Sequence, residues 1–133
     1  NSSTNSLSAI TATNTGNVNE TYSIMIDSVT LAGGDASLWR STDTTVGHDR
    51  FIFYSIFNNS SVGLADFQAN DIVLDYGQSS TANIYSNDGS GYTGVKVPKG
   101  DIRKLWLRLD MPSTISTIKE EKISITIEAT KDE

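Results

Sequence analysis

The apolar residues of this chain fall in short runs with a period of two, and this pattern is the strongest constraint on its fold. Residues 122–130, KISITIEAT, are the clearest case, with Ile123, Ile125, Ile127 and Ala129 at alternate positions. Successive side chains of a β-strand point to opposite faces, so the alternation predicts a strand with one buried face. We expect the three isoleucines to face the core.

Further strands are predicted over 22–27, 51–57, 71–76, 81–86 and 102–109, and a brief extended piece over 95–97. Residues 51–57, FIFYSIF, are apolar at almost every position, which predicts a central strand buried on both faces. In 102–109 one face carries leucines, and the other carries Trp106 between Lys104 and Arg108. About seven or eight short strands predict an all-β fold, an antiparallel Ig-like β-sandwich with a jelly-roll-like arrangement as its variant.

The length of the chain favours a single domain over residues 1–133. A chain of this size buries about two-thirds of the surface that its unfolded form exposes, which is enough for a core without disulfides or a structural metal. The sequence contains no cysteine. We therefore predict no disulfide, no metal and no cofactor, and a fold that depends on packing and on hydrogen bonds within the sheets.

Acidic residues outnumber basic ones, and the formal net charge is -6. This balance argues against a nucleic-acid partner, because the phosphate backbone attracts clusters of Lys and Arg. Residues 1–95 hold nine acids and two bases, whereas residues 96–133 hold seven acids and eight bases. Head-to-tail contacts between copies are therefore electrostatically mild or favourable. No apolar run approaches the ~20 residues of a membrane span, so none is predicted.

Residues 6–27 are predicted to form a β-hairpin whose turn is 14–17, NTGN, because glycine accepts positive φ and Asn side chains bond to nearby backbone. The first strand of this hairpin is uncharged and has no convincing core face. It is free to pair within its own domain or with the next subunit. Residues 1–14 are thus a candidate N-terminal extension or donor strand, with interface residues Leu7, Ala9, Ile10, Thr11 and Ala12.

Residues 12–22, ATNTGNVNETY, combine an Asn-Thr-Gly-Asn turn with a following strand that contains Tyr22. This motif resembles the hairpin of Ig-like modules that repeat in bacterial and archaeal surface proteins, such as the cell-adhesion-related domains. Those modules are secreted β-sandwiches. The resemblance therefore implies an extracellular or cell-surface protein with the same architecture.

Catalytic patterns are missing from the sequence. Nucleophilic catalysis needs a histidine beside Ser or Cys, yet His48 is the only histidine and no Gly-x-Ser-x-Gly turn occurs. Asp66, Asp71 and Asp75 offer carboxylates for glycoside hydrolysis, but nothing in the sequence fixes their separation. Residues 66–71 and 87–90 offer oxygen ligands without the spacing of a calcium loop. We expect a solvent-facing His48 and no enzymatic activity.

Exposed aromatic side chains are the remaining candidates for recognition. Tyr and Trp present an apolar face with a polar edge, which suits sugar stacking or subunit contacts. The candidates are Trp39, Tyr85, Tyr92 and Trp106, of which Trp106, flanked by two cations, favours a subunit contact. Asparagines that match the Asn-x-Ser/Thr glycosylation pattern are Asn1, Asn19, Asn58 and Asn59.

These features predict a structural subunit of an extracellular filament, a pilus-like fibre, or of a surface layer, assembled by head-to-tail β-strand addition. The first residue is Asn1, which we interpret as the start of a processed, mature chain. The expected partner is a second copy of the chain, together with other surface proteins or glycans. Two alternatives are a carbohydrate-binding or adhesion module of a secreted protein and a β-domain of a surface motor or secretion complex.

Overall fold

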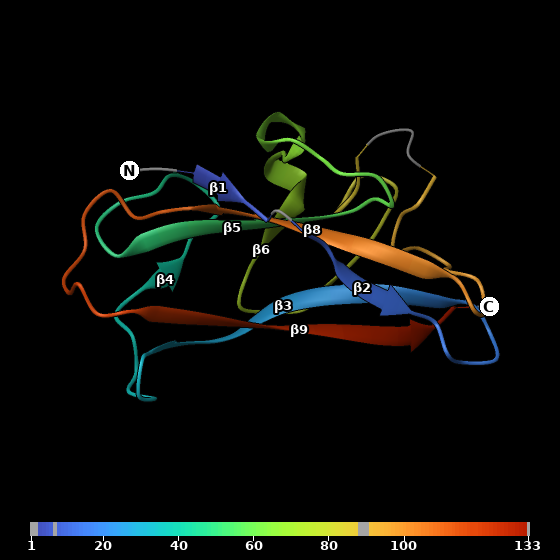
Figure 1. Cartoon of the computed structure of the whole chain (residues 1–133), viewed down its shortest axis with the longest axis horizontal. Coiled ribbons are helices and arrows are strands. Elements are labelled where there is room, and N and C mark those ends of the chain that lie inside the picture. The colour runs from blue at the N-terminus through green and yellow to red at the C-terminus, as the bar shows by residue number, and fades with distance from the viewer. Residues whose placement is uncertain (1–2, 7, 88–90, 133) are drawn as a thin grey trace.

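Two β-sheets lie face to face and enclose the core of the protein (Figure 1). The computed structural model describes residues 3–6, 8–87 and 91–132. The first sheet contains β1 (Ser3–Asn5), β2 (Ile10–Thr13), β4 (Arg40–Ser41), β5 (Arg50–Phe57), β6 (Ile72–Val73) and β8 (Ile102–Asp110). The second sheet contains β3 (Glu20–Leu31), β7 (Gln78–Ser79) and β9 (Glu121–Lys131). The predicted all-β sandwich is confirmed.

Strand β5 is buried on both faces, as its sequence predicts. Its odd-numbered side chains, Phe51, Phe53 and Phe57, belong to the main core between the sheets. Its even-numbered apolar side chains pack in a second cluster on the outer face of the first sheet, made up of Ile52, Tyr54, Ile56, Val62, Phe67 and Ile72. Residues 58–71, which contain the short 3-10 helices η1 (Leu64–Asp66) and η2 (Ala69–Asp71), cover this outer face. The molecule therefore has a third, irregular layer.

The second sheet follows the predicted alternation. Tyr22, Ile24 and Ile26 of β3 are fully buried in the main core. The isoleucines of β9 point to the same core, but Ile123, Ile125 and Ile127 are only partly buried. The core is thus closed at β3 in the middle of the sheet and less well covered at β9, which is the edge strand.

The predicted hairpin over residues 6–27 is wrong. β2 pairs antiparallel with β8 in the first sheet, whereas β3 pairs with β7 and β9 in the second. The turn between β2 and β3 crosses from one sheet to the other. Asn14 fixes this crossing, because its buried side-chain amide donates to the carbonyls of Val18 and Val97, at 2.8 and 2.9 Å, and its Oδ1 accepts from Gly16 N–H.

Two shorter predictions also fail. The strand predicted over 71–76 is limited to β6, and no strand forms over 81–86. In the latter segment Tyr85 has a positive φ of 58°, which interrupts an extended chain, while its side chain is fully buried. Tertiary packing of this aromatic ring overrides the local preference for a strand.

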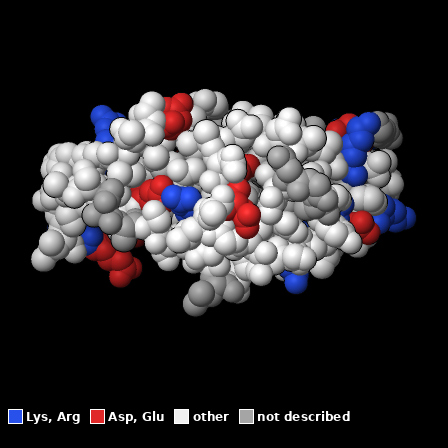
Figure 2. Space-filling model, turned by 90° about the horizontal axis from the view of Figure 1, so that it is seen from above, with Lys and Arg blue, Asp and Glu red and all other residues white. Residues whose placement is uncertain are grey.

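Charged side chains are scattered over the surface. Figure 2 shows that most of the face above β5 and β8 is uncharged and that acidic and basic side chains there lie near one another. Within the described ranges, no helix is long and apolar enough to cross a membrane.

Candidate functional site

An apolar groove opens between the two sheets at one end of the molecule, and we call it the β8–β9 groove. It has a volume of about 540 Å³. Its apolar wall is formed by Trp39, Phe53, Leu107, Leu109, Met111 and Ile123. Ile115 and Ile118 lie at its mouth and are 45% and 96% exposed. Apolar side chains that are partly exposed together in a groove mark a surface suited to a partner or ligand.

Two side chains of this groove have buried polar atoms with no hydrogen-bond partner among the described residues. One is the indole N–H of Trp39, a donor, and the other is the carboxylate of Glu121, an acceptor. Buried polar groups in proteins are nearly always paired, since an unmade hydrogen bond costs about 1–3 kcal/mol. Both groups are shielded from solvent by the side chains around the groove, so an occupant reaches them only if those side chains rearrange.

The outer edge of β9 borders the groove and has no strand partner among the described residues. Ala32 N–H donates to the carbonyl of Glu120, and Asp132 N–H donates to the carbonyl of Asn19. Bonded residues alternate in an antiparallel ladder, so even-numbered residues of β9 direct their backbone groups to β3. The N–H and C=O groups of odd-numbered residues such as Ile123 and Ile125 therefore point outward, while their side chains face the core.

The N-terminal run predicted as a donor strand lies on the edge of the first sheet in its own chain. Ile10, Thr11 and Ala12 pair with Leu105, Lys104 and Arg103 of β8. Ala12 packs against the main core, whereas Ile10 is 41% exposed. Ala9 is partly buried just before β2, and Leu7 lies outside the described residues. The structure thus shows this run paired within its own domain.

The four candidate aromatics do not form a common platform, and the prediction of an exposed Tyr85 is wrong because this side chain is fully buried. Trp39 is buried in the core against Phe51, with ring centroids 5.8 Å apart, so the prediction of an exposed Trp39 is wrong. Trp106 is also not a free surface, because residues 58–71 of the same chain cover it, and its indole N–H donates to Asn58 O at 2.6 Å. Only Tyr92 is exposed, at 47%, with the guanidinium of Arg103 over its ring.

The cation expected beside Trp106 binds elsewhere. Arg108 lies over the ring of Tyr54, with 4.8 Å between the guanidinium carbon and the ring centroid. The sequence predicted a cation–π pair or a subunit contact at Trp106. Instead, residues 58–71 of the same chain cover this outer face of the first sheet.

The candidate glycosylation sites differ in accessibility. Asn58 is buried and its Oδ1 accepts from Ser60 N–H, which makes it a poor acceptor for a glycan. Asn59 is partly buried, and its side-chain amide bonds to the backbone of Ile102 and Lys104. Asn19 is partly buried, while Asn1 lies outside the described residues.

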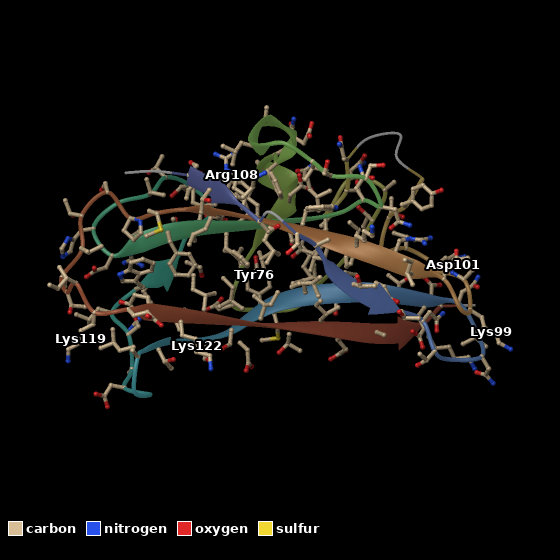
Figure 3. All side chains as sticks on the ribbon, viewed as in Figure 1. Tyr76, Lys99, Asp101, Arg108, Lys119 and Lys122 are labelled. Atoms are coloured by element: carbon tan, nitrogen blue, oxygen red, sulfur yellow. The ribbon has the colours of Figure 1, made fainter. Side chains whose placement is uncertain are left out.

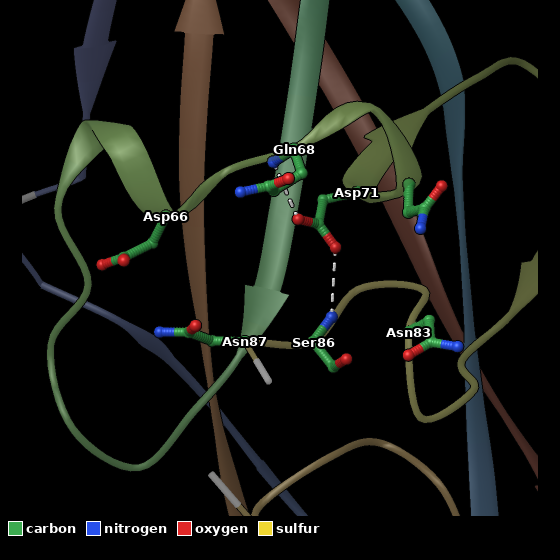
Figure 4. Close-up of a pocket in the computed structure, with 7 residues that line it drawn as sticks. Asp66, Gln68, Asp71, Asn83, Ser86 and Asn87 are labelled. Atoms are coloured by element: carbon green, nitrogen blue, oxygen red, sulfur yellow. Dashed lines mark hydrogen bonds between the residues drawn. The ribbon is translucent and has the colours of Figure 1, made fainter. Parts of the chain in front are cut away.

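A small polar pocket lies in the loop layer and includes the predicted carboxylates Asp66 and Asp71 (Figure 4). Asp71 is buried, and its two oxygens accept from the backbone N–H groups of Gln68 and Ser86 at 2.9 and 3.1 Å. These bonds join two loop segments, so Asp71 has a structural role. Among the described residues, no three His, Cys, Asp or Glu side chains are grouped to hold a metal ion.

His48 lies in an exposed loop, as predicted, but the fold places hydroxyl and carboxylate groups beside it. Its ring nitrogens bond to the hydroxyls of Thr114 and Ser116 at 2.7 and 3.0 Å. Ser116 donates to the Asp49 carboxylate through both its hydroxyl and its backbone N–H, and these two bonds lower the pKa of Asp49. A catalytic triad instead needs Asp on the histidine nitrogen that is opposite the serine. The cluster therefore cannot pass a proton from serine through histidine in that way.

Sequence reasoning missed both the β8–β9 groove and this histidine cluster. Each joins segments that are far apart in the chain, and no local pattern signals their contact. Comparisons of the chain with protein-family models, with curated proteins and with solved structures gave no match.

Proposed function

We propose that this chain is a structural subunit of an extracellular filament or surface layer, and that its subunits join head to tail by β-strand addition. The free outer edge of β9 carries this proposal. Unpaired edges promote pairing with another chain, and monomeric proteins protect them with prolines, bulges or inward-facing charges. β9 has no proline, and its central residues 123–127, ISITI, are uncharged, so the inward-facing charge of Glu121 and the register irregularity in the β3–β9 pair leave this central stretch open to pairing.

The shape of the contact determines the kind of assembly. A contact between two different surfaces of a subunit produces a filament when the operation that relates the copies does not close. Main-chain hydrogen bonds between added strands contribute about 1 kcal/mol each, and apolar burial adds ~25 cal/mol per Å². An edge of the length of β9 beside an apolar groove therefore supports a stable subunit contact.

Electron microscopy of the purified chain at neutral pH, with its mass from light scattering in the same buffer, tests the proposal. Fibres of uniform width would support it. A monomer of 14.4 kDa under conditions that preserve the fold would overturn it. In that case a carbohydrate-binding or adhesion module becomes the first candidate, to be tested by tryptophan fluorescence during titration with polysaccharides.

A variant that lacks residues 1–14 is the companion experiment. We expect it to be soluble, less stable and unable to polymerise, because β1 and β2 would be lost. Urea unfolding of the variant would establish that it folds. Unchanged fibres from a folded variant would exclude the N-terminal run as the donor.

A further inference from the structure

We propose that the acceptor for the added strand is the outer edge of β9 together with the β8–β9 groove, and that its occupant is the N-terminal run of a second copy, with residues 8–13 in contact. This inference rests on the proposed function and names the two surfaces that would meet. The alternative acceptor is β8, the strand with which β2 pairs within its own chain.

The chemistry of the run fits the groove. Residues 8–13, SAITAT, are uncharged, and Ile10 and Ala12 share one face of the strand. An incoming strand paired with β9 would place alternate side chains against the apolar wall. A charged strand would instead be buried at a high cost.

The exit point of the run and the groove lie at opposite ends of the molecule. Asn14 holds the exit, since its N–H donates to Asp101 O and its carbonyl accepts from Gly100 N–H. Figure 3 shows Lys99 and Asp101 at one end of the long axis and Lys119, which lines the groove, at the other end. A run released from β8 but still anchored at Asn14 extends beyond the Asp101 end.

We place a second copy beyond the Asp101 end of the first, in the same orientation. The groove end of the second copy then faces the Asp101 end of the first. The run then enters with Thr13 nearest Glu121 and its earlier residues toward Lys131. Strand β9 leads away from the groove end toward Lys131 (Figure 1), so the run is antiparallel to β9. Antiparallel addition to an edge is the more stable mode of pairing. The placement repeats without closing, as a filament requires.

Transfer of the run to β8 of the neighbour has a different outcome. Within one chain, β2 and β8 are antiparallel. For the run of one chain to pair antiparallel with β8 of another, the second copy must be turned end for end. Each copy then donates its run to the other, and this two-fold exchange closes as a dimer. The direction of the strands therefore favours β9 as the acceptor in a filament.

Disulfide trapping distinguishes the two acceptors, and the absence of cysteine from the chain makes each introduced thiol unique. Ile10→Cys is mixed, before assembly, with one of Ile123→Cys, Ile125→Cys or Ile127→Cys, and the fibres are then oxidised. A linkage between two single variants can only join different molecules. Gln78→Cys, on β7 at the opposite edge of the same sheet, is the matched control.

We expect mixed dimers on a denaturing gel with at least one β9 variant and none with Gln78→Cys. The competing acceptor is tested by mixing Thr11→Cys with Lys104→Cys, which are paired residues in β2 and β8. Trapping of only this pair would overturn the β9 acceptor: if the trapped species are fibres, the filament proposal remains, and if they are closed dimers alone, the filament proposal falls as well. Failure of the unsubstituted chain to form fibres would overturn the filament proposal itself and, with it, this inference. Urea unfolding of each variant confirms that it is folded before mixing.

Discussion

The guanidinium of Arg108 binds the carboxylate of Asp110 through two hydrogen bonds, Nε to Oδ1 at 2.7 Å and Nη2 to Oδ2 at 3.0 Å. Both residues lie on β8, and both side chains are largely shielded from solvent. The same carboxylate accepts from the hydroxyls of Tyr54 and Ser3. Asp110 therefore connects the first strand of the chain to the centre of the sheet.

Replacement of Asp110 by Asn should weaken the attachment of β1. We expect a loss of about 1 kcal/mol in the free energy of unfolding, because a charge-assisted pair becomes neutral while part of the hydrogen bonding remains. Backbone amides of β1 should exchange faster with deuterium. Asp101→Asn is the matched control, since Asp101 is more exposed and lies 3.6 Å from Arg103. An equal effect in both variants would contradict the special role of Asp110.

The same effect should depend on pH. Burial raises the pKa of Asp110, but hydrogen bonds from Arg108 and Ser3 outweigh it and hold the pKa below 3.8. The ionised Asp110 then makes its full contribution to the free energy of unfolding above pH 3.8. This contribution is lost as the pH falls through the folded-state pKa. The difference between wild type and Asp110→Asn in urea unfolding should shrink over that range. A constant difference at low pH would contradict the assignment.

Replacement of Asn14 by Ala should be more damaging. The variant removes the side-chain amide that donates to the carbonyls of Val18 and Val97 in a buried site, so Val97 keeps only the bond from Glu20 N–H. We expect a loss of about 2–3 kcal/mol in the free energy of unfolding. Asn17→Ala is the control, because Asn17 is exposed in the same turn. Chemical denaturation of both variants measures the difference, and similar midpoints would refute the importance of this crossing.

Gly94 is a position where a side chain has no room. A Cβ atom there would lie 2.5 Å from Ser80 Oγ and 2.8 Å from the ring of Phe57. Gly94→Ala should therefore cost about 2 kcal/mol through overpacking. At Gly77 a Cβ would meet nothing within 4 Å, so Gly77→Ala should change stability little. Thermal unfolding of the two variants tests this prediction. Equal stabilities would show that Ser80 and Phe57 move aside at little cost in free energy.

The buried Tyr85 should make the fold sensitive to alkali. Burial, with smaller effects of Tyr76 and Asp71, raises the pKa of Tyr85 from 10.0 to about 12. The folded state then holds this proton more tightly, so stability is fully present below pH 10 and falls as the pH rises toward 12. Urea unfolding across this range should show the decline, and Tyr85→Phe should flatten it. Tyrosinate absorbance of the folded protein should show a late-ionising group that Tyr85→Phe lacks.

The sequence by itself determined which residues form the main strands and which way their side chains point. The alternation in β8 and β9 and the double-sided apolar run of β5 are local properties, because successive side chains of a strand must face opposite sides. The all-β class followed from them. The same local information placed the isoleucines of β9 toward the core.

Only the tertiary structure decided which strands are neighbours. A period of two specifies a buried face but not a partner, so the turn around Asn14 was predicted as a hairpin although it crosses between sheets. The loop layer that covers Trp106 and the burial of Trp39 likewise depend on contacts between distant segments. The β8–β9 groove exists because no described strand pairs with the outer edge of β9, and the pairing of strands depends on the whole fold.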